Sequence, residues 1–147
     1  MTRKNLLFIP ALLLLFASSS YATDTLLNFP IEQAMKNGEV LAAINKNVAL
    51  YWGAQPTPAT AQTYGNFKTS KRTTSLGKSQ QDACEWALAS ALIALQDRAL
   101  REGGNAVVNI QSNINNHPTS SQTHYSCLVG SVMVNVALTG NAVKLAH

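Results

Sequence analysis

The chain has 147 residues, room for one domain, and a formal charge of +4 from 11 Lys and Arg against 7 Asp and Glu. Only 12 % of the residues are charged and 46 % are hydrophobic, which excludes a disordered acidic or basic tail. Two cysteines are too few for a disulfide-dense mini-protein or a four-thiolate zinc site.

The first 22 residues have the layout of a secretory signal peptide. Arg3 and Lys4 precede an apolar run over residues 6–16, and small residues lead to a cleavage site after Ala22. The apolar run is shorter than the roughly 20 residues that span a bilayer. An uncleaved membrane anchor is the alternative. Cleavage removes two positive charges, so the basic balance says little about nucleic acid.

The region up to residue 74 predicts short elements. Pro30 at the first helical position and Gly38 after the end favour a helix over residues 30–37, and a second helical stretch is possible over residues 39–45. Alternating apolar residues predict a strand over residues 48–52, followed by a loop over residues 53–62. Threonine-rich residues 67–74 predict an exposed or edge strand.

Residues 79–102 predict one long helix of about 35 Å. Ser79 is a suitable N-cap, with Asp82 three residues later, and Gly103 is a suitable stop. The helix has two apolar stripes, and we expect the sheet and the N-terminal segment to cover them. A surface left for a partner is the alternative. The stripes are Cys84, Leu88, Ala91, Leu92, Leu95 and Ala99, and Trp86, Ala89, Ile93 and Leu100.

The rest of the chain predicts two further strands. They cover residues 105–113 and 125–138, with a polar connection over residues 115–123. In the second strand, Leu128, Val132 and Val134 share one face. We therefore predict a single α+β domain over residues 23–147, in which one long helix packs on a mostly antiparallel sheet.

Export would place Cys84 and Cys127 in an oxidising compartment, where a pair of cysteines usually bonds. Strict alternation puts Cys127 on the face opposite Leu128, so the disulfide requires a bulge or a helix on the face of Cys127, Val129 and Met133. The alternatives are a reactive thiol at the helix start and a metal site with His124, spaced H-x-x-C.

A basic cluster precedes the long helix. It consists of Lys68, Lys71, Arg72 and Lys78, and it is a candidate contact for phosphate, lipopolysaccharide or an acidic partner. The alternative is a solvated edge strand that resists sheet-to-sheet aggregation. Gly77-Lys78-Ser79 matches only the end of a P-loop, because Arg72 stands where that motif needs glycine.

No set of nucleophile, base and oxyanion donor can be assembled from the sequence, so we expect neither a catalytic site nor a cofactor. His117 and His124 flank the polar connection and are metal candidates together with His147. Solvent-exposed loop histidines are the alternative reading.

Three stretches resemble a known group of proteins. The first runs from CEWAL (residues 84–88) to REGGNAV (residues 101–107), and the second is YSC (residues 125–127). The third runs from GSVM (residues 130–133) to VALTG (residues 136–140). Together they resemble small exported bacterial proteins often labelled "excinuclease ATPase subunit", although the P-loop and zinc cysteines of such an ATPase are absent. More distantly, the helix and strands resemble the RcsF-like outer-membrane lipoproteins that sense envelope stress, without their additional cysteines and lipid anchor. The resemblance implies the fold and an envelope setting, with no catalytic residues to carry over.

We therefore expect a periplasmic or secreted, non-enzymatic domain that acts through contacts with an envelope or extracellular protein. Nucleic acid is not an expected partner, and no transmembrane segment should remain after signal cleavage. A periplasmic module that binds a small ligand or a metal is the alternative, and an enzyme is the third hypothesis.

Overall fold

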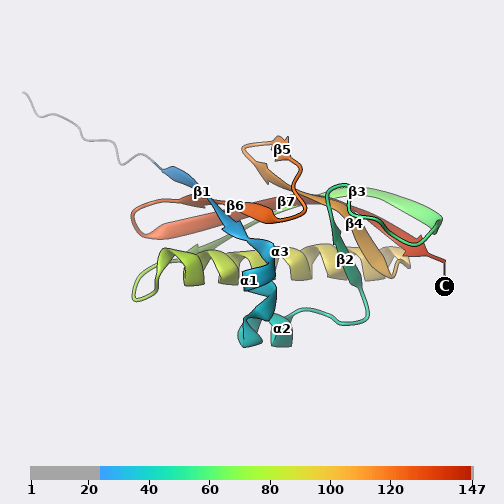
Figure 1. Cartoon of the computed structure of the whole chain (residues 1–147), viewed down its shortest axis with the longest axis horizontal. Coiled ribbons are helices and arrows are strands. Elements are labelled where there is room, and N and C mark those ends of the chain that lie inside the picture. Colours follow the sequence, from blue (N-terminus) through green and yellow to red (C-terminus); the bar gives the residue numbers. More distant parts are fainter. Residues whose placement is uncertain (1–23, 147) are drawn as a thin grey trace, which may run out of the picture.

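The computed structural model describes residues 24–146, so the expected signal peptide and His147 lie outside the described residues. This region forms an α+β domain with three helices and a curled seven-stranded sheet (Figure 1). The elements in chain order are β1 (Thr25–Pro30), α1 (Ile31–Lys36), α2 (Gly38–Ala43), β2 (Ala49–Trp52), β3 (Thr60–Thr74), α3 (Gln80–Glu102), β4 (Ala106–Ile114), β5 (His117–Thr119), β6 (His124–Val129) and β7 (Met133–Leu145).

β7 is the centre of the sheet. One of its edges pairs with β3 along nearly its whole length, and the other is shared by β6 near its start and β4 further along. β1 pairs with β6, β5 pairs with β4, and β2 pairs with β4. The β2–β4 pair is parallel and the other pairs are antiparallel, so the sheet is mostly antiparallel.

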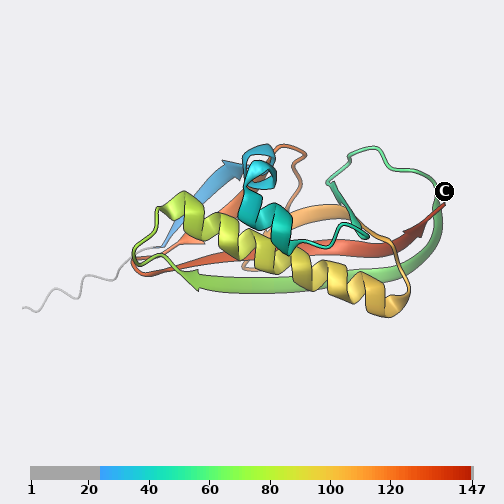
Figure 2. The same cartoon turned by 90° about the horizontal axis from the view of Figure 1, so that it is seen from below.

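α3 crosses one face of the sheet, with α1 and α2 beside it (Figure 2). The predicted caps are confirmed: the Ser79 side chain accepts a hydrogen bond from the Asp82 N–H, and Gly103 adopts the left-handed conformation that glycine tolerates. The first apolar stripe is fully buried. The second is only partly covered, because Trp86 and Leu100 remain 41 % and 43 % exposed.

The prediction of one strand over residues 125–138 is wrong. The chain reverses after Val129, where the Gly130 N–H donates to the Met133 carbonyl over 2.8 Å, and β6 and β7 form an antiparallel hairpin. A Cβ atom on Gly130 would lie 2.9 Å from a carboxylate oxygen of Asp24 and 3.2 Å from the Met133 carbonyl oxygen, so a larger residue at this turn would displace the Asp24 side chain.

The same hairpin explains how Cys127 reaches the helix. Because the turn interrupts the alternation, Cys127 and Val129 lie on the face of α3 together with Val134, whereas Leu128 lies on the opposite face. Of the two expected routes, the bulge is not needed: α3 lies on the face of Cys127 and Val129, as the second route expected, but Met133 belongs to the opposite face. The Cys84–Cys127 disulfide is present, with both cysteines fully buried and their Cα atoms 6.0 Å apart.

Four local features were not predicted. β1 starts the described chain, and β5 lies within the expected polar connection. In β4, Asn109 has a positive φ of 50° at a bulge, which lets both Val107 and Ile110 pack into the core. Gly38 begins α2 rather than only ending α1, because the Asn37 side chain caps α2 by accepting from the Glu39 N–H.

Candidate functional site

We call the side of the sheet away from α3 the open face. Lys68, Ser70 and Arg72 of β3 pair with Thr139, Ala137 and Asn135 of β7, and these six residues belong to the open face. The alternate residues of β7, Val134, Val136 and Leu138, are buried in the core that α3 covers. Figure 1 shows that no helix lies on the open face and that the β4–β5 hairpin rises beside it. The open face is therefore the side of the sheet that no helix covers, with Lys68, Ser70 and Arg72 exposed and Ala137 and Thr139 buried within it.

The structure divides the predicted basic cluster. Lys68 and Arg72 share the open face, because they are four positions apart, which is two full repeats of the strand alternation. Lys71 pairs with Val136 and belongs to the other face. Lys78 lies in the turn before α3, where its ammonium group stands 5.9 Å from the ring centre of Trp86. Only two of the four cations thus form part of a common site.

A polar hollow of about 410 Å³ lies on the open face beside the β4–β5 turn. Its lining combines two cations with side-chain amides and hydroxyl groups and contains no acidic residue. Asn113 at its wall is only 5 % exposed, and its side-chain oxygen has no hydrogen-bond partner within the protein. The lining is Lys68, Thr69, Ser70, Arg72, Asn113, Asn115, Asn116, Asn135 and Ala137.

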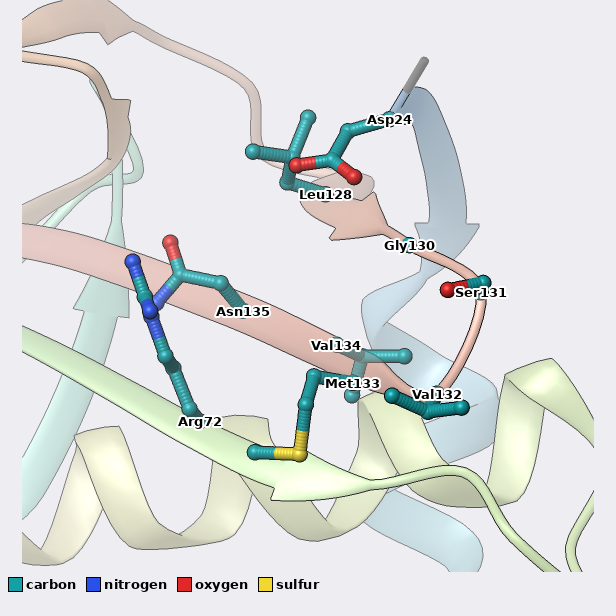
Figure 3. Close-up of a pocket in the computed structure, with 9 residues that line it drawn as sticks. All are labelled: Asp24, Arg72, Leu128, Gly130, Ser131, Val132, Met133, Val134 and Asn135. Atoms are coloured by element: carbon teal, nitrogen blue, oxygen red, sulfur yellow. The ribbon is translucent and has the colours of Figure 1, made fainter. Parts of the chain in front are cut away.

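A second hollow of about 180 Å³ adjoins the first and shares Arg72 and Asn135 with it. Figure 3 shows the two side chains next to each other, with Asp24 across the hollow and the apolar side chains of Val132 and Met133 along its rim. The Asn135 amide donates to the Ser70 hydroxyl over 2.8 Å and to the Lys71 carbonyl over 3.0 Å. These hydrogen bonds hold one wall of both hollows in place.

The charges of the open face have no carboxylate partner among residues 24–146. The ion pairs of this region are Lys36–Glu32 and Arg98–Glu102, and neither involves Lys68 or Arg72. A guanidinium group can donate two parallel hydrogen bonds to a carboxylate or phosphate. The arrangement is therefore suited to holding an anionic group between Arg72 and Lys68.

The structure does not bring the predicted metal candidates into one site. His117 lines a hollow with Leu26 and Ile114, and His124 lines a different one with Trp52. Within the described part of the chain, no group of three or more His, Cys, Asp or Glu side chains could hold a metal ion. Because both cysteines are in the disulfide, the alternatives of a reactive thiol and of a His124–Cys127 metal site are wrong.

A buried polar group next to the disulfide was not predicted. Glu85 on α3 is 5 % exposed and accepts hydrogen bonds from Asn37 and Gln81, which joins the α1–α2 corner to α3. The hydroxyl group of Tyr125 is buried without a partner. Burial, and to a smaller extent the charge of Glu85, raises the pKa of Tyr125 above its ordinary value.

No helix between residues 24 and 146 has the length and apolarity needed to cross a membrane. Compared with known family models, curated proteins and solved structures, the chain matches none. The functional assignment therefore depends on the chemistry of the open face.

Proposed function

We propose that this chain is an exported, non-enzymatic binding domain that contacts an acidic surface of a partner protein through its open face. The apolar run over residues 6–16 supports export, and the buried disulfide fits an oxidising compartment. The resemblance to RcsF-like envelope proteins supports the same setting, the periplasm or the outside of the cell, and a related fold.

The observation that carries the proposal is the position of Arg72 between two adjoining hollows. Arginine is enriched in protein interfaces because its planar group recognises carboxylates with defined geometry. Lys68 adds a second positive charge, and Val132 and Met133 add apolar contact area at the rim. Complementary charge of this kind steers a partner and sets its orientation.

A small anionic ligand is the second candidate, favoured by the size of the hollow at Lys68. Its volume of about 410 Å³ lies within the range of roughly 300–1,000 Å³ that small-molecule sites occupy. The two cations and the asparagine amides would hold a carboxylate or phosphate group there. The metal-binding version of this alternative has no comparable group of side chains among residues 24–146.

Site-specific photocrosslinking tests the first candidate. A photoreactive amino acid is placed at Ser70 on the open face or, as a control, at the exposed Ser90 on α3, and irradiated in the cell envelope of the source bacterium. We expect discrete protein adducts at Ser70 that Arg72→Glu removes and that do not form at Ser90. Identical adducts at both positions, or none at Ser70, would contradict the proposal. If no adducts form at Ser70, titration of the protein with inorganic phosphate or citrate tests the small-ligand candidate.

A further inference from the structure

β3 is an edge strand with one free side. Among the described residues it pairs only with β7, so its other edge has no strand beside it. The C-terminal half of α3 underlies the first part of β3, where the Tyr64 hydroxyl donates to the Gly103 carbonyl and Arg98 stands 4.0 Å from the ring centre of Phe67. The N-terminal half of α3 turns toward β6, to which the disulfide joins it (Figure 2). Residues 68–74 therefore present an edge that α3 does not cover.

The free edge over residues 68–74 is regular. The register with β7 runs without interruption from Phe67 to Thr74, and the irregular positions of β3 lie between Thr60 and Gly65. In an antiparallel pair, every second residue directs its N–H and C=O groups away from the partner strand. At about 3.3 Å per residue, seven residues give an edge of about 23 Å, the length of an ordinary strand.

Charge decides which strand this edge accepts. β3 carries Lys68, Lys71 and Arg72 and no acidic residue. A second copy of β3 would bring like charges together, so the edge disfavours pairing with itself. An acidic segment would meet cations on both faces of the sheet, since Lys68 and Arg72 belong to the open face and Lys71 to the other.

We propose that residues 68–74 accept an extended acidic segment of a partner protein as an added β-strand. Backbone hydrogen bonds hold the segment at the edge, and its acidic side chains pair with Lys68, Lys71 and Arg72. This inference rests on the proposed function, because one face of the added strand extends the open face. The added strand also requires backbone hydrogen bonds between the partner segment and residues 68–74, whereas contact with the open face alone does not.

Hydrogen exchange with a designed peptide tests the inference. The oxidised protein, purified from the envelope fraction, is mixed with a seven-residue peptide that carries glutamates opposite the three cations and threonine or valine elsewhere. The control peptide has the same side chains, but N-methyl groups on alternate residues remove the backbone donors on one edge. We expect the first peptide to slow exchange of the outward amides of residues 68–74 and to bind about tenfold or more tightly than its methylated form.

Two variants of matched charge complete the test. Lys68→Glu with Arg72→Glu should abolish peptide binding, whereas Lys46→Glu with Lys144→Glu, exposed residues outside this edge, should leave it intact. Equal binding of the two peptides, or no change of exchange in residues 68–74, overturns the inference. If exchange slows only in β4, whose Asn113 lines the hollow of the open face, the added strand is refuted. Crosslinks from Ser70 that Arg72→Glu removes would then still support the proposed function.

Discussion

Removing the disulfide should cost this domain a large share of its stability. Cys84 and Cys127 are separated by 43 positions, and in the chain-entropy treatment a crosslink that closes a loop of this size stabilises the folded state by about 4 kcal/mol. Domains of ordinary stability have a free energy of unfolding of about 5–15 kcal/mol. We therefore expect Cys84→Ala with Cys127→Ala to lower the melting temperature by about 15 °C.

Urea unfolding followed by circular dichroism measures the effect. The oxidised protein, the same protein reduced with a thiol, and the double alanine variant are compared at one pH. Reduction keeps both buried sulfur atoms in the core, so a similar loss in the reduced protein and the variant would assign the effect to the crosslink rather than to packing. A free energy of unfolding within about 1 kcal/mol of the oxidised protein in both cases would refute the reasoning.

Three other changes test the packing and the buried polar groups. Gly140→Ala should cost about 1–3 kcal/mol in urea unfolding, because the new Cβ would lie 2.6 Å from Val107, whereas Gly38→Ala, with nothing within 4 Å, should not destabilise. An equal loss in both glycine variants would contradict this packing argument. Gln96→Leu should cost about 2–4 kcal/mol by the same assay, because its side chain donates to the Asn45 and Val48 carbonyls and accepts from the Asn45 N–H, and all three hydrogen bonds are lost; a neutral result would show that they contribute little. Tyr125→Phe should be neutral or stabilising at pH 7, because it removes a buried hydroxyl group without a partner. Because the pKa of Tyr125 is raised in the folded state, the wild type should lose stability as the pH rises above the ordinary tyrosine value of 10.0. Tyr125→Phe should reduce this loss. Parallel profiles of stability against pH for the two proteins would contradict the burial of an unpaired hydroxyl group.

The helix α3 could be predicted from the sequence because its signals are local. Ser79 and Asp82 mark its start and Gly103 marks its end within a few residues of the helix itself. The disulfide could be predicted because only one intramolecular pair can form from two cysteines. Both predictions depend on chemistry that needs no knowledge of the rest of the fold.

The β6–β7 hairpin could not be predicted in the same way. Apolar residues continue on both sides of Gly130, so hydrophobic alternation alone does not show where the chain reverses. The close approach of Asp24 to this turn joins positions far apart in the sequence. β1 was missed because its adjacent leucines, Leu26 and Leu27, hide the alternation that its pairing with β6 requires.

The candidate site was predicted in part. The sequence places Lys68, Lys71, Arg72 and Lys78 close together along the chain. Strand geometry separates Lys71 from its neighbours, and the turn before α3 carries Lys78 to Trp86. The asparagine wall of the hollow comes from the β4–β5 turn, more than forty positions away, and only the folded sheet brings it to Arg72.

The central position of β7 has a consequence for how the chain folds during synthesis. β7 is the last strand in chain order, and it is the strand with which β3, β4 and β6 all pair. Until residues of β7 have been synthesised, β3 has no neighbouring strand among the described residues, and α3 has no complete surface to cover. Closure of the sheet therefore depends on a strand that is synthesised after the strands it joins, and β3 can pair only after α3, β4, β5 and β6 have been made. Contacts between strands so far apart in the sequence slow folding.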